Sequence, residues 1–139
     1  MDINRKTLHF SDLDKNVKMA FLSTTIIGLL IHIYKFTNTL PNHDSVYNYY
    51  SDQNVVGSGR WLLSIACGFS SYFDLPWVNG LLSIIFIAAT ATVIVKLFDI
   101  KNYVLIIITS GLLVSFPAIT ETFFFGFTAD GYMLAMFLA

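Results

Sequence analysis

Three long apolar blocks constrain the fold of this chain more than any other feature. Residues 17–36, 77–95 and 103–119 each approach the length of about 20 helical residues that a bilayer crossing needs. Hydrophobic residues make up 55% of the sequence, which is more than an ordinary soluble domain carries. No sustained alternation of polar and apolar residues indicates the strands of a membrane barrel. We therefore predict an all-α membrane protein.

Charge and cysteine usage exclude several functional classes. The net charge of -1 gives no basic field for nucleic acid. Cys67 is the single cysteine, which excludes an intrachain disulfide and a cysteine metal cluster. The three histidines (His9, His32 and His43) are too scattered to form a metal-site spacing. We expect no metal, no cofactor and no nucleic-acid partner.

The apolar blocks divide the chain into segments of a single membrane domain, residues 1–139. In order, we predict a cytoplasmic lead (1–18), a first span (17–36), an outer loop (38–76) with an interfacial helix (60–73), a second span (77–95), a third span (103–119) and the start of a fourth span (128–139). The last segment has roughly half the length that a crossing needs. We interpret the chain as the amino-terminal part of a longer protein.

A polar stripe runs along the first predicted span. Thr24, Gly28, His32 and Lys35 are spaced by four, four and three residues, so they share one helical face. Such a stripe is expected to face other helices rather than lipid. We interpret His32 as a hydrogen-bonded packing residue in preference to a proton carrier. Lys35, near the helix end, has two readings: a side chain that extends to the interface, or a phosphate ligand.

Lysine and arginine positions predict the orientation of the chain. With the amino terminus in the cytoplasm, six basic residues lie on the inner side and only Arg60 and Lys35 on the outer side. This asymmetry favours the cytoplasmic amino terminus. The outer side then also holds the acids of three separate segments (Asp44, Asp52, Asp74, Glu121 and Asp130).

These outer charges match the needs of glycosyl transfer from a lipid-linked donor. The reaction requires a base for the acceptor hydroxyl and cationic groups near the phosphate leaving group. Asp44 is well placed for the base, and Arg60 for a bidentate phosphate contact, with Lys35 as a weaker candidate. Simpler readings stay open: Asp44 as a helix cap, Arg60 as an interface anchor, and Glu121 and Asp130 as solvated loop-end charges.

Three motifs resemble a known family. They are NHDSVYNYY after the first span, GSGRWLL before the interfacial helix, and FPAITETFFFGFTADGYMLAMFLA at the end of the chain. Over residues 29–139 the chain resembles the amino-terminal part of the type II O-antigen glucosyltransferases, the serotype-converting membrane enzymes. That family usually has two adjacent acids where this chain has His43 and Asp44, so Asp44 stands alone in this position.

The resemblance implies a GT-C-like helical bundle of about four transmembrane segments, with its active site on the outer face of the bacterial inner membrane. It implies undecaprenyl-phosphate-glucose as donor, lipopolysaccharide O-antigen as acceptor, and no cofactor. Asp44 and Glu121 match the family's acids and are the predicted catalytic residues. Arg60 and Trp61 match the Gly-Arg-Trp motif. With Lys35 and Asp130, they form the predicted substrate-binding set.

Two other functions compete with glucosyl transfer. A lipid flippase or transporter would favour charges near the bilayer midplane, where His32 alone is expected to lie. A non-catalytic, truncated membrane remnant would fit the short fourth span.

Overall fold

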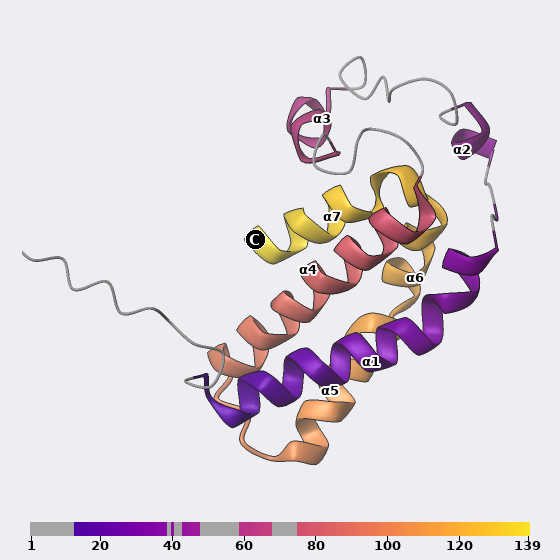
Figure 1. The fold of residues 1–139 in the computed structure, drawn as a ribbon. Coiled ribbons are helices and arrows are strands. Elements are labelled where there is room, and N and C mark those ends of the chain that lie inside the picture. The colour runs from indigo at the N-terminus through magenta and orange to yellow at the C-terminus, as the bar shows by residue number, and fades with distance from the viewer. Residues whose placement is uncertain (1–12, 39, 41–42, 48–58, 68–74) are drawn as a thin grey trace, which may run out of the picture.

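The computed structural model describes residues 13–38, 40, 43–47, 59–67 and 75–139. All regular secondary structure in these residues is α-helical (Figure 1). The helices are α1 (Lys15–Thr37), α2 (His43–Tyr47), α3 (Trp61–Cys67), α4 (Pro76–Leu97), α5 (Tyr103–Ser115), α6 (Pro117–Phe124) and α7 (Gly126–Leu138). Of the predicted interfacial helix, the part at 61–67 is helical, and 68–73 lies outside the described residues.

Two helices are long and apolar enough to cross a membrane by themselves. They are α1, with 23 residues, and α4, with 22 residues. Asp14 caps α1, because its carboxylate accepts a hydrogen bond of 2.8 Å from the Asn16 backbone N–H. Pro76 begins α4, where its fixed φ suits the first helical turn and its missing N–H costs nothing. The prediction of an all-α membrane protein is confirmed.

The third predicted span is broken into two helices. α5 and α6 meet at an angle of 45° around Phe116, and together they could form one bent span or a re-entrant segment. Proline disfavours helical geometry in the residue before it, and Phe116 accordingly has ψ 133°. Pro117 begins α6, so the single span predicted at 103–119 is two helices in the structure.

A single residue, Phe125, separates α6 from α7. α6 ends at Phe124, and Gly126 begins α7. From there α7 runs back beside α4 (Figure 1). Its 13 residues rise by about 20 Å. The turn therefore places both helix ends beside the start of α4.

The buried face of α1 includes three residues of the predicted stripe, Thr24, Gly28 and His32, whereas Lys35 is only partly buried. The buried residues of α1 recur every fourth position (Ala20, Thr24, Gly28, His32 and Phe36) and face α4 and α5. The His32 ring is 3% exposed, stacks on Phe123 with centroids 4.0 Å apart, and lies 3.1 Å through Nε2 from the Val114 carbonyl oxygen. These contacts agree with the packing role expected for His32.

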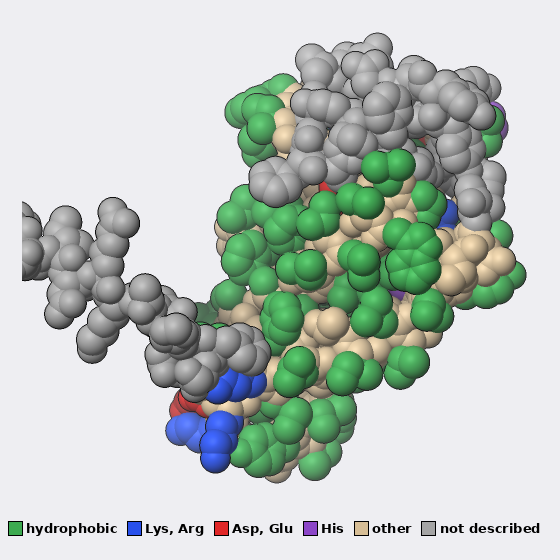
Figure 2. All heavy atoms as spheres, viewed as in Figure 1, with side chains coloured by type: hydrophobic (Ala, Val, Ile, Leu, Met, Phe, Trp, Pro, Cys, Tyr) green, Lys and Arg blue, Asp and Glu red, His purple; other side chains and the backbone are tan. Residues whose placement is uncertain are grey.

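The opposite face of α1 is apolar and exposed. Leu22, Ile26, Leu30 and Ile33 are 49%, 56%, 72% and 46% exposed and follow the same helical spacing. Figure 2 shows hydrophobic side chains spread over the visible face of the bundle, with a group of lysines and acids at the end where α1 begins. Such a continuous apolar surface is suited to contact with lipid.

Candidate functional site

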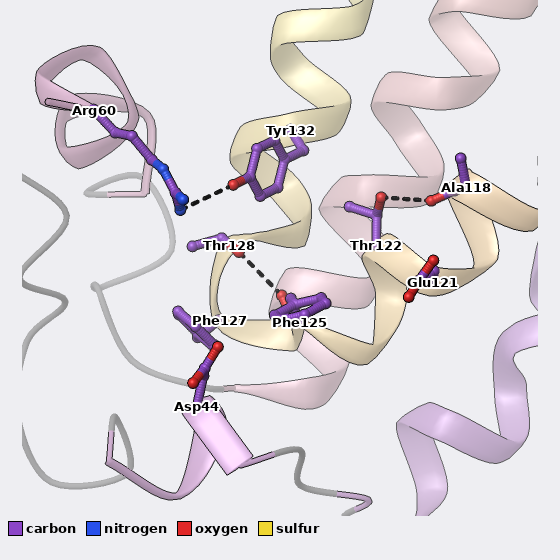
Figure 3. A pocket seen from close by; sticks show the side chains of 9 residues that line it. All are labelled: Asp44, Arg60, Ala118, Glu121, Thr122, Phe125, Phe127, Thr128 and Tyr132. Carbon is purple, nitrogen blue, oxygen red and sulfur yellow. Dashed lines mark hydrogen bonds between the residues drawn. The ribbon is translucent and has the colours of Figure 1, made fainter. Parts of the chain in front are cut away.

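A cavity of about 380 Å³ lies at the end of the bundle that carries α2 and α3. Three of the residues predicted from the sequence line it: Asp44 from α2, Arg60 from the start of α3, and Glu121 from α6 (Figure 3). Its other lining residues come from α6 and α7 (Ala118, Thr122, Phe125, Phe127, Thr128 and Tyr132). We call this hollow the carboxylate cavity. It brings together residues that are as far apart in the sequence as Asp44 and Tyr132.

Arg60 is held over the cavity by a turn and a hydrogen bond. Gly59 has φ +78°, a left-handed conformation that glycine adopts without steric cost, and Arg60 follows it. The Arg60 carbonyl accepts a 3.0 Å bond from the Leu63 N–H, which fixes the start of α3. The Arg60 Nη1 donates to the Tyr132 hydroxyl oxygen over 3.2 Å (Figure 3). The guanidinium is thus directed toward α7 and the cavity.

Asp44 lies in the first turn of the short helix α2, with 64% of its side chain exposed. The neighbouring His43 has its Nδ1 3.7 Å from the Asp44 Oδ1. Figure 3 places Asp44 next to Phe127 at one side of the cavity. An accessible carboxylate of this kind can accept a proton from a bound hydroxyl group.

Glu121 reaches the cavity from one face of α6. Ala118, Glu121, Thr122 and Phe125 follow the i, i+3, i+4, i+7 spacing of a single helical face, and all four line the cavity. The Thr122 hydroxyl donates to the Ala118 carbonyl oxygen over 2.7 Å, so its proton is already used within the helix. Glu121 is exposed and supplies the second carboxylate.

Three predicted substrate-binding residues do not line the carboxylate cavity. Lys35 donates through Nζ to the Leu40 carbonyl oxygen over 2.5 Å. Trp61 is 65% exposed on α3. Asp130 is 1% exposed within α7. α3 packs against α7 near this residue. Burial, and secondarily the negative charge of Asp130, raise the pKa of the Cys67 thiol to about 12.

A second hollow adjoins the first. A groove of about 310 Å³ runs between α3 and α7, and Arg60 and Tyr132 line both hollows. The rest of its lining is aliphatic or glycine (Leu62, Leu63, Ile65, Ala66, Gly131, Leu134, Ala135 and Leu138). We call it the aliphatic groove. Its position allows one amphipathic molecule to place a polar group at Arg60 and an apolar chain between the helices.

Gly131 permits the close approach of α3 to α7. A Cβ atom at this position would lie 3.2 Å from the Cys67 Sγ and closer still to the Leu63 side chain. The sequence analysis did not single out Gly131 or Tyr132. The four-residue spacing from Thr128 to Tyr132, on a helix that follows the Glu121 segment, is the signal that points to Tyr132.

The lining groups define what the carboxylate cavity can do. Two carboxylates can accept protons or hydrogen bonds from hydroxyl groups, and a guanidinium can bind an anionic oxygen. Phe125 and Phe127 provide apolar surface of the kind that contacts the face of a sugar ring.

Comparison with known proteins places this arrangement in context. A family model described as glucosyl transferase GtrII matches residues 33–139. The matched region begins within α1 and includes every residue that lines the carboxylate cavity and the aliphatic groove. No curated protein and no solved structure matches the chain.

Proposed function

Because the chain belongs to the glucosyl transferase GtrII family, we propose that its carboxylate cavity is where a lipid-linked glucose donor meets a glycan acceptor. The proposed donor is undecaprenyl-phosphate-glucose, and the proposed acceptor is the O-antigen of lipopolysaccharide. The observation that carries this proposal is that Asp44, Arg60 and Glu121, from three separate segments, line one cavity.

The proposed reaction is a direct displacement at the anomeric carbon of glucose. The acceptor hydroxyl oxygen forms a bond to this carbon while the bond from the carbon to the phosphate oxygen breaks. Asp44 accepts the proton of the hydroxyl group, and undecaprenyl phosphate leaves with the electron pair. The Asp44 carboxylate suits this role because it is accessible at the cavity edge.

Arg60 is the proposed ligand of the donor phosphate. A guanidinium has five N–H donors, so the bond to Tyr132 leaves others for phosphate oxygens. Negative charge on the leaving phosphate grows as the glycosidic bond breaks, and a fixed cation stabilises that charge. The aliphatic groove begins at the same arginine and would take the first part of the prenyl chain.

Glu121 is the proposed second catalytic carboxylate. From α6 it would accept hydrogen bonds from sugar hydroxyl groups and so hold the acceptor oxygen near the anomeric carbon. Phe125 and Phe127 would contact the sugar rings. Lys35 and Trp61 would contact parts of the donor or acceptor that extend beyond this cavity. Asp130 is 1% exposed, so it would act by positioning α7 and not by touching substrate.

The proposed location is the bacterial inner membrane, with several crossings and the amino terminus in the cytoplasm. The lysine-rich ends of α1 and α4 would then be cytoplasmic, and the carboxylate cavity would open to the outer face. A lipid-linked donor and a growing surface glycan could meet at that face.

The first experiment compares glucosylation of lipopolysaccharide in cells that express the wild-type protein or Asp44→Asn. We expect the substitution to lower the rate about 10²- to 10⁴-fold, the usual contribution of a general base. Asp99→Asn is the matched control, because this exposed acid lies in the turn after α4, away from the cavity. Activity in Asp44→Asn equal to that of the control would exclude Asp44 as the base.

A further inference from the structure

A separate hollow of about 770 Å³ lies at the other end of the bundle, away from the carboxylate cavity. The first turns of α1 and the last turns of α4 form its sides, with Phe137 of α7 against it. Its walls are largely apolar, but Lys18 from α1 and Lys96 from α4 also line it. We call it the lysine hollow. It shares no lining residue with the proposed catalytic site.

Both lysines lie at the depth of lipid headgroups if α1 and α4 cross the bilayer. Lys18 is in the first turn of α1 and Lys96 is in the last turn of α4, and the two helices pack against each other. From Lys18 to Lys35, α1 rises about 26 Å, which is close to the ~30 Å thickness of the hydrocarbon core. Phe21 and Val93 continue the hollow by about one turn toward the bilayer centre.

Among the described residues, three charged side chains line the lysine hollow: Lys18, Lys96 and Asp14. Asp14 caps α1, where its Oδ1 accepts the 2.8 Å bond from the Asn16 N–H. Lys18 and Lys96 come from two different helices, so the hollow can offer a phosphate group charge-assisted hydrogen bonds from two sides.

We propose that the lysine hollow binds an anionic glycerophospholipid from the leaflet at the amino-terminal end of α1. The phosphate lies between Lys18 and Lys96, and an acyl chain lies along Phe21, Val93 and Phe137. Basic pockets between membrane helices hold anionic headgroups in this way. A soluble phosphate would match the lysines but leave the apolar wall uncovered. A lipid satisfies both parts of the hollow.

The test measures lipid retained by the purified protein in neutral detergent, by native mass spectrometry. Phosphatidylglycerol and phosphatidylcholine with the same acyl chains are the probes. We expect selective retention of phosphatidylglycerol, and about 30-fold weaker retention in Lys18→Gln/Lys96→Gln, from the attraction that two lysines contribute. The control Lys15→Gln/Lys101→Gln removes the same charge at the same end, from residues outside the lining, and should retain the lipid.

A second variant tests the apolar wall. Val93→Trp narrows the lysine hollow and keeps both lysines. The variant should no longer retain phosphatidylglycerol, while its helical content should stay unchanged. Equal losses in the two lysine pairs would show diffuse attraction and overturn the proposal. Equal retention of both lipids would show binding without selection for the anionic headgroup and would overturn the proposal. No retention by the wild type would also overturn it and would favour a protein segment or a second copy of the chain as the occupant.

Discussion

Arg60 joins the carboxylate cavity to the aliphatic groove, so its loss should affect donor binding before anything else. Hydrogen bonds to a charged group contribute about 1.5–3 kcal/mol, so Arg60→Ala should raise the donor KM by about 10- to 100-fold. Arg60→Lys keeps the positive charge but lacks the planar set of N–H donors. Its donor KM should therefore lie between those of the wild type and Arg60→Ala. Initial rates at varied donor concentration check this.

Tyr132→Phe is the control for the arginine variants. It removes only the Tyr132 hydroxyl group, which accepts the hydrogen bond from Arg60, and leaves the guanidinium in place. Its KM should therefore change less than that of Arg60→Ala. An unchanged donor KM together with an unchanged kcat in Arg60→Ala would exclude the phosphate role.

The thiol of Cys67 should react slowly. Burial raises its pKa from 9.0 to about 12, and the charge of Asp130 adds to this increase. At a given pH below 9, the thiolate fraction is then about a thousandfold lower than in an ordinary cysteine. Iodoacetamide labelling of the single cysteine should accelerate on unfolding, and modestly in Asp130→Asn, because removing the negative charge lowers the thiol pKa. Rapid labelling of the folded protein would contradict this.

Three of the six site residues predicted from the sequence line the carboxylate cavity, and the other three do not. Asp44, Arg60 and Glu121 could be found because each is a charged residue next to an apolar segment. The burial of Asp130 could not be found this way, because it depends on how α7 packs against α4 and α3, which are distant in the sequence. Local patterns do not contain those contacts.

At the level of elements, apolar length predicted the two long helices α1 and α4. The caps were not predicted: Asp14 and Asn102 start α1 and α5 through side-chain bonds to backbone N–H groups. The break at Phe116 divides the single span predicted at 103–119 into two helices. Proline removes one hydrogen bond and constrains the residue before it, so α5 ends before Pro117 and a new helix begins there. That break turns Glu121 toward the cavity.

The packing of α1 on α4 depends on a glycine. A Cβ atom at Gly80 would overlap the Phe36 ring, whereas one at Gly111 would meet Ile27 at an ordinary 3.8 Å. Gly80→Ala should therefore destabilise the protein by about 1–3 kcal/mol through overpacking. Gly111→Ala should be neutral or stabilising, because alanine favours a helix by about 1 kcal/mol over glycine. Thermal unfolding in detergent compares them, and equal midpoints would contradict the close contact.

At the scale of the whole molecule, the bundle separates two kinds of polar group. The end that carries α2 and α3 holds the carboxylate cavity, and the end where α1 begins holds a group of lysines (Figure 2). The apolar part of α1 that separates the two ends rises by about the thickness of the hydrocarbon core of one bilayer. This separation explains how one short bundle could hold the carboxylate cavity at one side of a membrane and the anchoring lysines at the other.

Thiol labelling in a Cys67→Ala background can test which end of the bundle faces the cytoplasm. His43→Cys reports on the cavity end, and Asp99→Cys reports on the turn between α4 and α5; both side chains are exposed. Because lysines favour the cytoplasmic side, a membrane-impermeant maleimide applied to spheroplasts should label His43→Cys and spare Asp99→Cys until the membrane is opened. The reverse pattern would place the cavity in the cytoplasm, where a surface glycan could not reach it. Labelling of both positions in intact cells would mean that α4 does not cross the membrane, since the helix joins the two ends.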